Sequence, residues 1–369
     1  MRIIMSGGGT GGHIYPAITI IRAIQKEDES CEVLFIGTQD GLESDIIPKE
    51  GFDFRTIDVR GFERKLSMRN LHTVIKAIGS VWQSMQIIRN FKPDVVIGTG
   101  GYVCGPVLMA ASMMNIPTMI QEQNVIPGIT NKILSRFVDK IAVGYGEAIT
   151  YFPHKDKIFV SGNPIRPEVL SATREEGIAA LDLDPTKRTI LISGGSRGAH
   201  SINQAMVQVH QQFAGSRDIQ LLHVTGQNEY NSIVGNLKQC CIDTTMAGNI
   251  IIKPYLYNMP QALAVADIAV FRAGAIGLAE LTARGIPSIL IPYPYAAENH
   301  QEFNAKVMEQ QGAAVVIRDK DLNGVRLIEV INELVNSSQR LDDMATASKK
   351  IGCANAAEII AKMARKMVK

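Results

Sequence analysis

Four times in this chain, a short apolar run breaks into glycines and then resumes as an apolar pattern with helical spacing. The four segments span residues 2–18, 94–106, 189–199 and 267–275. Each is typical of a β-strand, a tight loop and the start of an α-helix. Strands that alternate with helices form parallel sheets, so the chain is predicted to be an α/β protein with two Rossmann-like, doubly wound domains. Glycine loops before helix N-termini bind phosphate, which predicts a ligand held in a cleft between two facing domains.

The first segment is the richest in glycine, with the run SGGGTGGH at 6–13. His13 lies at the edge of this loop, and Pro16 is expected in the first turn of the helix that follows. The run also fits the dinucleotide fingerprint, which requires an acidic residue at the end of the second strand. The predicted second strand, 33–36, ends without an acid, and Asp40 lies in the next loop. A nicotinamide enzyme is therefore the second interpretation.

Composition limits the class of protein. The chain has 369 residues, 46% of them hydrophobic and 20% charged, which is enough for two or three domains with full cores. A formal net charge of +2 argues against a nucleic-acid binder. No stretch approaches the roughly 18 apolar residues of a membrane span, and the N-terminus does not resemble a signal peptide. Five cysteines without a metal-ligand spacing are typical of reduced thiols in a cytoplasmic protein.

The charge of the chain is most uneven at 64–93, a segment with six basic residues and no Asp or Glu. Its apolar residues recur with helical spacing, so one interpretation is a core-facing stripe beside a solvated basic face. Residues 132–137 repeat this mixture of basic and apolar side chains. Together the two segments are predicted to rest on an anionic membrane surface. The residues expected at that surface are Arg64, Lys65, Arg69, Lys76, Trp82, Lys132 and Arg136.

Turn-forming residues at 162–167 follow a predicted strand and mark a domain linker. The first predicted domain spans residues 1–163, and the second spans residues 164–352. A C-terminal helix, 353–369, is expected to pack back on the first domain.

Glu122, Asp182 and Asp184 lie in patterns typical of functional carboxylates. Glu122 follows a predicted strand, at the edge where doubly wound sheets bind ligands, and is a candidate site carboxylate. Asp182 and Asp184 imitate the acidic pair that holds a metal in some sugar transferases. Pro185 follows them, so a helix end and a turn are expected there, and no metal site is predicted.

Seven motifs, in order along nearly the whole chain, resemble those of the family 28 glycosyltransferases. They are GGTGGH at 8–13, GTGGY at 98–102, EQN at 122–124, GNPIR at 162–166, GGS at 194–196, RAGA at 272–275 with Glu280, and NHQ at 299–301 with Asn304. The resemblance implies the GT-B fold and no cofactor. It implies an inverting transfer of N-acetylglucosamine from UDP-N-acetylglucosamine to the C4 hydroxyl of the N-acetylmuramyl unit of lipid I, giving lipid II and UDP in peptidoglycan synthesis. It also implies a peripheral place on the cytoplasmic face of the bacterial membrane, with other cell-wall synthesis enzymes as partners.

The same resemblance implies that the first domain, 1–163, binds the acceptor and the membrane and that the second, 164–352, binds the UDP-sugar. It also implies roles for individual residues. The donor-binding positions would be Thr10, Gly11, Gly12, Asn124, Arg166, Ser196, Leu256, Ala275, Glu280, His300, Gln301 and Asn304. The acceptor diphosphate would bind at Gly11, Gly12, Gly100, Gly101 and Tyr102. Three positions depart from the family pattern, since Gly277 lacks a hydroxyl, Arg197 adds a charge and Gln121 replaces a histidine.

The chemistry of such a transfer agrees with these roles. A departing UDP carries negative charge, which helix N-termini stabilise without a metal. A sugar hydroxyl needs a base, and His13 is the first candidate because histidine exchanges protons near neutral pH. Glu122 is the second candidate. The alternatives from other classes are a nicotinamide oxidoreductase, a UDP-sugar epimerase on the same fold and a non-catalytic nucleotide-sugar sensor.

Overall fold

The computed structural model describes residues 1–59, 68–240, 242 and 248–368, without the side chains of 68–77. The chain divides into two compact units. Unit 1 comprises Met1–Ile165 and Asn355–Lys369, and unit 2 comprises Arg166–Ala354.

The strands of unit 1 form a parallel sheet in the order β3-β2-β1-β4-β5-β6-β7. They are β1 (Arg2–Ser6), β2 (Glu32–Gly37), β3 (Asp53–Thr56), β4 (Val95–Gly98), β5 (Thr118–Glu122), β6 (Lys140–Val143) and β7 (Ile158–Val160). The strand order reverses direction between β1 and β4, the place where doubly wound sheets bind ligands. The glycine loops at 7–12 and 99–101 directly follow these two strands.

Helices cover both faces of this sheet. They are α1 (Gly11–Glu27), α2 (Glu43–Lys49), α3 (Met68–Phe91), α4 (Cys104–Met113), α5 (Ile129–Leu134) and α15 (Ala356–Met367), with short 3₁₀ turns η1 (Gly146–Tyr151) and η2 (Lys155–Lys157). Ile3 and Met5 of β1 pack with α1 and α15, whereas Ile4 packs with α3 and α4 on the other face. A strand buried on both faces is apolar at every position, which explains the continuous run in β1.

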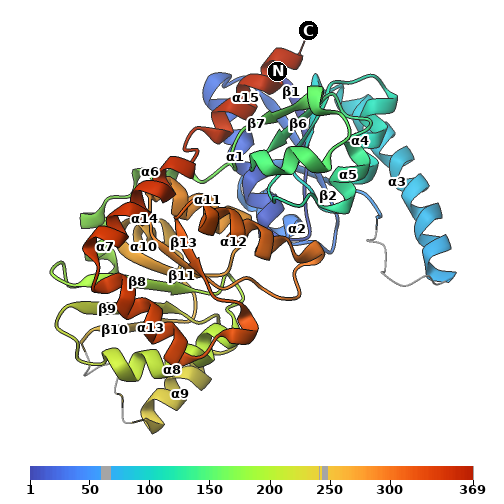
Figure 1. Cartoon of the computed structure of the whole chain (residues 1–369). Coiled ribbons are helices and arrows are strands. Elements are labelled where there is room, and N and C mark those ends of the chain that lie inside the picture. Colours follow the sequence, from blue (N-terminus) through green and yellow to red (C-terminus); the bar gives the residue numbers. More distant parts are fainter. Residues whose placement is uncertain (60–67, 241, 243–247, 369) are drawn as a thin grey trace. The chain divides into compact units, whose positions relative to one another are not determined.

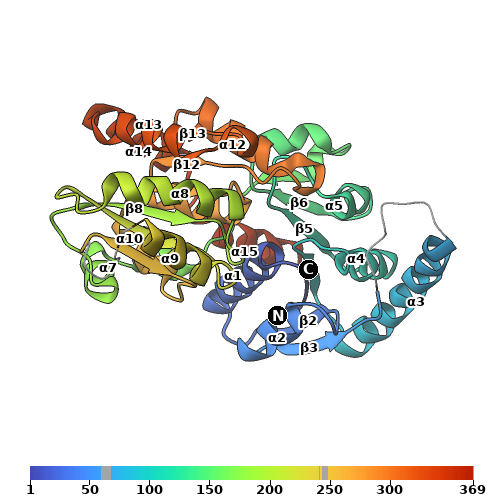
Figure 2. The same ribbon diagram turned by 90° about the horizontal axis from the view of Figure 1, so that it is seen from below.

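The C-terminal helix α15 belongs to unit 1 and packs beside α1 (Figures 1 and 2). Ile360, Ala361 and Ala364 are fully buried in the same core as Ile3 and the apolar face of α1. The last residues of the chain therefore complete the core that supports the first glycine loop.

The first helix begins earlier than predicted. It starts at Gly11, so the expectation that Pro16 lies in the first turn was wrong. Thr10 has an extended backbone and its carbonyl accepts the first helical N–H bonds, whereas Pro16 only removes the bond that it would donate to Gly12. Gly11, Gly12 and His13 consequently form the first turn of α1.

The strands of unit 2 form a second parallel sheet, in the order β10-β9-β8-β11-β12-β13. They are β8 (Arg188–Ser193), β9 (Ile219–Val224), β10 (Ile250–Lys253), β11 (Ala266–Phe271), β12 (Ser288–Leu290) and β13 (Ala314–Val316). The helices are α6 (Pro167–Ser171), α7 (Arg174–Leu181), α8 (His200–Phe213), α9 (Tyr230–Gln239), α10 (Met259–Val265), α11 (Ala275–Arg284), α12 (His300–Gln310), α13 (Gly324–Val335) and α14 (Ser338–Ile351), with 3₁₀ turns η3 (Ala297–Asn299) and η4 (Asp319–Asp321). Buried side chains fill both faces of this sheet as well.

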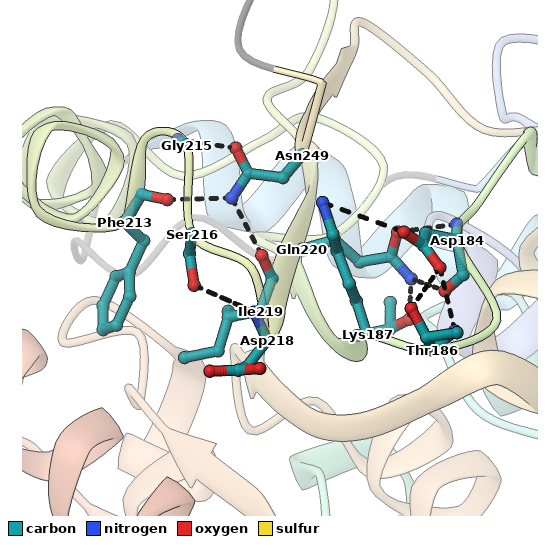
Figure 3. Close-up of polar contacts among 11 residues, drawn as sticks. Asp184, Thr186, Lys187, Phe213, Gly215, Ser216, Asp218, Ile219, Gln220 and Asn249 are labelled. Atoms are coloured by element: carbon teal, nitrogen blue, oxygen red, sulfur yellow. Dashed lines mark hydrogen bonds and ion pairs between the residues drawn. The ribbon is translucent and has the colours of Figure 1, made fainter.

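The acidic pair at 182 and 184 ends a helix and forms a turn, as predicted. Asp182 caps the C-terminus of α7 in the left-handed conformation, with a φ of 54°. Asp184 Oδ1 accepts hydrogen bonds from the hydroxyl and the N–H of Thr186, and these bonds lower the pKa of Asp184. Figure 3 shows Gln220 holding the same turn through the N–H and the carbonyl of Asp184. The carboxylate of Asp184 is therefore used by the hydrogen bonds of this turn.

Two histidines are buried side by side in unit 2. His210 Nε2 lies 3.0 Å from His223 Nδ1, and His223 Nε2 lies 3.0 Å from Asn203 Oδ1. The amide of Asn203 donates to the Thr225 carbonyl, so its oxygen accepts from His223 and His223 accepts from His210. Burial lowers the pKa of His210 to about 4 and, with repulsion from His210, lowers the pKa of His223 well below its ordinary value.

This pair predicts that unit 2 loses stability in mild acid. The folded protein keeps His210 neutral while the unfolded chain takes up its proton near pH 6.5, so the contribution of His210 is complete above pH 6.5 and is lost toward pH 4. The loss from His210 should be about 3 kcal/mol. Urea unfolding at several pH values measures how the free energy of unfolding changes with pH. Between pH 6.5 and pH 4, this change should be smaller for His210→Gln than for the unsubstituted chain. An unchanged slope would contradict the prediction.

Candidate active site

The glycine loops after β1 and β4 interlock in unit 1. The Gly8 N–H donates to the Gly100 carbonyl over 3.3 Å, and the Thr99 hydroxyl donates to the His13 carbonyl over 2.8 Å. Gly101 has a φ of 87°, and a Cβ atom there would lie 2.5 Å from the Gly8 carbonyl oxygen. This contact requires glycine, because the backbone conformation and the close approach both exclude a side chain.

The interlocked loops orient His13. Its Nδ1 lies 2.9 Å from the Gly8 carbonyl oxygen. Because a carbonyl only accepts, Nδ1 carries the proton of the neutral ring and Nε2 presents a lone pair. A Cβ on Gly100 would lie 3.0 Å from Nε2, so only glycine leaves room for the ring at this place. His13 is thus held in the tautomer that a general base requires.

The N-terminus of α1 lies directly before His13. Gly11 and Gly12 occupy its first two positions, and Thr10 precedes them with an exposed side chain. The first N–H groups of a helix have no helical acceptor and carry partial positive charge, so this end suits an anion. Tyr102 is close by, since a Cβ on Gly9 would lie 3.8 Å from its ring. The structure therefore gathers the predicted diphosphate residues of unit 1 around two loops.

Glu43 supports the first glycine loop through a hydrogen bond from the Gly9 N–H. No sequence motif indicated this role of Glu43. Its side chain is fully buried. One carboxylate oxygen accepts from the Gly9 N–H over 3.0 Å, and the other accepts from the Thr38 N–H and hydroxyl over 3.1 and 2.7 Å. A Cβ on Gly8 would lie 2.4 Å from the carboxylate. A buried carboxylate directly behind this loop holds its backbone in place.

Glu122 has the environment of a structural carboxylate rather than a base. It is 2% exposed, and its Oε1 accepts from the backbone and side-chain N–H groups of Asn124 over 2.9 and 3.2 Å. Its Oε2 accepts from the Gly128 N–H over 3.1 Å and from Asn131 Nδ2 over 2.8 Å. These bonds use its lone pairs to shape the loop after β5 and to place Asn124. The geometry therefore weighs against Glu122 as the second candidate base and favours His13.

Buried amides tie the loop after β5 to its neighbours. Gln121 Nε2 donates to Asn163 Oδ1 over 3.0 Å, and Asn163 Nδ2 donates to the Gln123 carbonyl over 2.9 Å. Gln123 Nε2 donates to the Thr99 carbonyl over 2.6 Å. Gln121 is fully buried, and its side chain is enclosed in this network. Position 121 therefore supplies no base in this chain.

In unit 2, the predicted diphosphate residues lie in the loops after β8 and β11. Ser196 and Arg197 are exposed in the first of these loops. Ala275 is the first residue of α11, and Gly277 is the third. The N–H groups of both belong to the helix N-terminus, so Gly277 offers a backbone donor in place of a side-chain hydroxyl.

Arg272 positions this second site, a role that its motif alone did not reveal. Its Nη1 donates to the Ile291 carbonyl over 3.1 Å and to Asp319 Oδ1 over 2.5 Å. Its Nη2 donates to the Ser201 hydroxyl over 2.9 Å. The guanidinium thus joins the end of β11 to α8 and to the end of β12.

Glu280 and Arg166, both predicted donor contacts, form an ion pair within unit 2. Arg166 Nε and Nη2 donate to Glu280 Oε1 over 3.0 and 2.9 Å. Glu280 is 7% exposed, and its burial raises its pKa although the charge of Arg166 opposes the change. Two hydrogen bonds from Arg166 hold Oε1 of Glu280 in place, and the ion pair therefore fixes the rotamer of Glu280.

The remaining predicted donor residues make local contacts within unit 2. Gln301 Oε1 accepts from the Tyr293 N–H over 3.0 Å, and Asn304 Nδ2 donates to the Ala273 carbonyl over 3.2 Å. His300 Nδ1 donates to the Ala297 carbonyl over 2.6 Å. Leu256 is 8% exposed and belongs to the apolar core. Their roles toward a sugar nucleotide stay predictions.

Across the part of the chain that the structure describes, no three His, Cys, Asp or Glu side chains are grouped so as to hold an ion. The helix N-termini at these loops carry partial positive charge.

Both units are doubly wound parallel sheets with glycine loops before helix N-termini, which is the GT-B architecture of nucleotide-sugar glycosyltransferases. The model of the glycosyltransferase family 28 N-terminal domain matches residues 3–143, and that of the family 28 C-terminal domain matches residues 189–360. The chain belongs to glycosyltransferase family 28.

Named relatives narrow the resemblance further. The chain is 49% identical to the UDP-N-acetylglucosamine--N-acetylmuramyl-(pentapeptide) pyrophosphoryl-undecaprenol N-acetylglucosamine transferase of Desulforamulus reducens, over 100% of this chain and 99% of the relative. The crystal structure of Acinetobacter baumannii MurG has a TM-score of 0.79 and 26% identity, and the match covers 99% of both chains.

A UDP-GlcNAc 2-epimerase from Neisseria meningitidis shares the fold, with a TM-score of 0.69, 14% identity, and a match over 99% of this chain and 100% of that chain. The fold alone therefore does not separate transferase from epimerase, and the full-length identity to the named transferase makes that distinction.

Proposed function

We propose that this chain transfers N-acetylglucosamine from UDP-N-acetylglucosamine to the C4 hydroxyl of the muramyl unit of lipid I, with inversion at the sugar C1. The observation that carries the proposal is His13, whose Nδ1 is fixed by the Gly8 carbonyl so that Nε2 is left as an acceptor. Full-length identity of 49% to a transferase named for this reaction supports the same substrates.

The proposed reaction assigns each step to residues of the chain. The helix N-terminus at Ala275 and the loop at Ser196 hold the donor diphosphate, while Glu280 binds the ribose hydroxyls. The acceptor diphosphate lies at Gly11 and Gly12. The C4 hydroxyl oxygen bonds to the sugar C1, the bond from C1 to the UDP oxygen breaks, and His13 Nε2 takes the hydroxyl proton. Helix N-termini stabilise the negative charge on UDP.

A transfer assay tests this function. The chain, UDP-N-acetylglucosamine and a lipid I analogue should give a lipid II analogue and UDP, detected by mass spectrometry. Turnover should survive EDTA, because helix N-termini replace a cation in this mechanism. Loss of activity in EDTA that magnesium or manganese restores would contradict the charge argument. Turnover of the donor without acceptor would favour an epimerase, and donor binding without turnover would favour a sensor.

We also propose peripheral binding to the cytoplasmic face of an anionic membrane. In the described residues, no helix is both long and apolar enough to cross a bilayer. Ile78 and Trp82 of α3 are 68% and 63% exposed, and Ile133 and Phe137 are exposed beside Arg136. Exposed apolar side chains next to basic ones suit an anionic lipid surface. Of the predicted membrane residues, Arg64 and Lys65 lie outside the described residues, as do the side chains of Arg69 and Lys76.

Vesicle sedimentation tests the membrane proposal. Binding to phosphatidylglycerol vesicles should exceed binding to neutral phosphatidylcholine vesicles and should fall as salt rises. Trp82→Ser with Phe137→Ser should weaken binding about tenfold or more, because two apolar side chains no longer enter the lipid. The matched control is Tyr257→Ser, which removes an 87% exposed aromatic side chain from unit 2. Equal losses in both variants would argue against this surface.

A further inference from the structure

One peptide group of the first glycine loop is held from both sides. His13 Nδ1 donates to the Gly8 carbonyl over 2.9 Å, and the N–H of the next residue, Gly9, donates to Glu43 Oε2 over 3.0 Å. The carbonyl of Gly8 and the N–H of Gly9 belong to the same planar peptide unit. In a trans peptide these two groups point in opposite directions. Glu43 and the ring of His13 therefore lie on opposite sides of one peptide.

This peptide has little stiffness of its own. It joins two glycines, and Gly9 has a φ of 81°, in the left-handed region that favours glycine. Without Cβ atoms on either side, the peptide can rotate more freely than one between other residues. The Gly8 N–H is held only by a long bond of 3.3 Å to the Gly100 carbonyl. The bond from the Gly9 N–H therefore contributes directly to the orientation of the Gly8 carbonyl toward His13.

The carboxylate that accepts this bond is itself fixed. Glu43 is the first residue of α2, and its side chain is fully buried. Its Oε1 accepts from the N–H and the hydroxyl of Thr38 over 3.1 and 2.7 Å, while Oε2 accepts from Gly9. Both oxygens accept from N–H groups, as those of an ionised carboxylate do. A Cβ on Gly37 would lie 2.6 Å from Cγ of Glu43, so a glycine there leaves room for this side chain.

We propose that Glu43 is a positioning residue that acts on His13 through the peptide between Gly8 and Gly9. The inference rests on the proposed function, in which His13 Nε2 takes the hydroxyl proton. A carboxylate at the Gly9 N–H polarises the peptide and makes the Gly8 oxygen a stronger acceptor for the Nδ1 proton. Nδ1 then keeps its proton, Nε2 keeps its lone pair, and the imidazolium formed in the reaction is stabilised. No proton passes to the peptide or to Glu43.

Other groups beside this peptide do not supply the same effect. The Thr10 hydroxyl lies 3.5 Å from His13 Nδ1, farther than the Gly8 oxygen, and it carries no charge. The Cys104 thiol contacts the backbone of the second glycine loop, and burial raises its pKa to about 11, so it is neutral near pH 7. In the described part of the chain, the first glycine loop hydrogen-bonds to one carboxylate, that of Glu43.

Nitrogen NMR of isotope-labelled protein measures which ring nitrogen of His13 carries the proton. In alkaline solution, where the ring is neutral, the unsubstituted chain should favour the Nδ1–H form by about 10:1 or more. The spectrum of His13→Ala identifies the signals. In Glu43→Gln the ratio should fall about tenfold, because a neutral amide polarises the peptide less than a carboxylate does. Thr38→Val keeps the carboxylate but removes one of its donors, so its ratio should lie between the two.

The spectrum of the unsubstituted chain uses no variant, so a ring in the Nε2–H form overturns the proposal even if Glu43→Gln does not fold. An unchanged ratio in Glu43→Gln overturns it as well. If that variant does not fold, an unchanged ratio in Thr38→Val has the same consequence.

Steady-state kinetics gives a second measurement. Glu43→Gln should lower kcat about tenfold, whereas the UDP dissociation constant should change less than about twofold, because the proposed donor residues belong to unit 2. The matched control is Asp139→Asn. Asp139 Oδ2 also accepts from the N–H and the hydroxyl of one threonine, Thr118, but at the start of β5 and β6. This variant should keep its kcat, even where thermal melts show a similar loss of stability. Equal losses of kcat in both variants would reduce Glu43 to a structural role.

The NMR measurement separates this inference from the proposed function, since it requires no donor and no acceptor. If the unsubstituted chain transfers sugar to no acceptor, the proposed function fails, and the ratio of the two ring forms still decides whether Glu43 orients His13. If the chain transfers sugar while the ring of His13 is in the Nε2–H form, the function stands and the role of Glu43 is wrong.

Discussion

Replacing His13 with alanine should lower the turnover number about 10²- to 10⁴-fold, the usual loss when a general base is removed. The affinity for UDP should stay nearly unchanged, because His13 belongs to unit 1 whereas the proposed donor residues Ser196, Ala275 and Glu280 belong to unit 2. Steady-state kinetics with a lipid I analogue gives the turnover number, and calorimetric titration with UDP gives the affinity.

The matched control for this experiment is His154→Ala, which removes an exposed histidine of unit 1 and should leave both measurements unchanged. His13→Gln adds a second comparison, since an amide keeps a polar side chain at this place but is not a general base. A His13→Ala variant that loses UDP affinity while its turnover at saturating donor stays normal would identify His13 as a donor contact. The base would then have to come from another residue.

Replacing Glu280 with alanine should raise the KM for UDP-N-acetylglucosamine about 5- to 150-fold, with a smaller effect on kcat. The change removes the acceptor for the ribose hydroxyls and leaves the guanidinium of Arg166 without its buried carboxylate, at a cost of about 1–3 kcal/mol. Initial rates over a range of donor concentrations measure the effect. Glu333→Ala, which removes an exposed glutamate of the same unit, is the matched control.

The ion pair makes a second variant informative. Glu280→Gln keeps an oxygen for Arg166 but loses the charge, so its KM should lie between those of the unsubstituted chain and Glu280→Ala. An unchanged KM in Glu280→Ala would show that the carboxylate serves only to hold Arg166. A thermal melt distinguishes the two roles, because breaking a structural ion pair lowers the melting temperature whether or not donor is present.

The sheets and their glycine loops could be predicted from local pattern alone. The apolar run in β1 and the glycines at 7–12 are each a few residues long, and backbone preference and burial act on such short stretches directly. The same reasoning identified the turn at Asp182. It failed at Pro16, because the helix start depends on the extended conformation of Thr10, which residue type alone does not reveal.

The organisation of the candidate site depended on contacts between distant residues. Glu43 reaches the Gly9 N–H across 34 positions of sequence, and Arg166 reaches Glu280 across 114. No periodicity links such pairs, since their approach follows from the order of strands in each sheet. Local pattern therefore supplied the strands, the loops and His13 as a candidate base. Three features follow only from tertiary packing. The Gly8 carbonyl orients His13, hydrogen-bond donors surround Glu122, and Glu43 binds the backbone of the first loop.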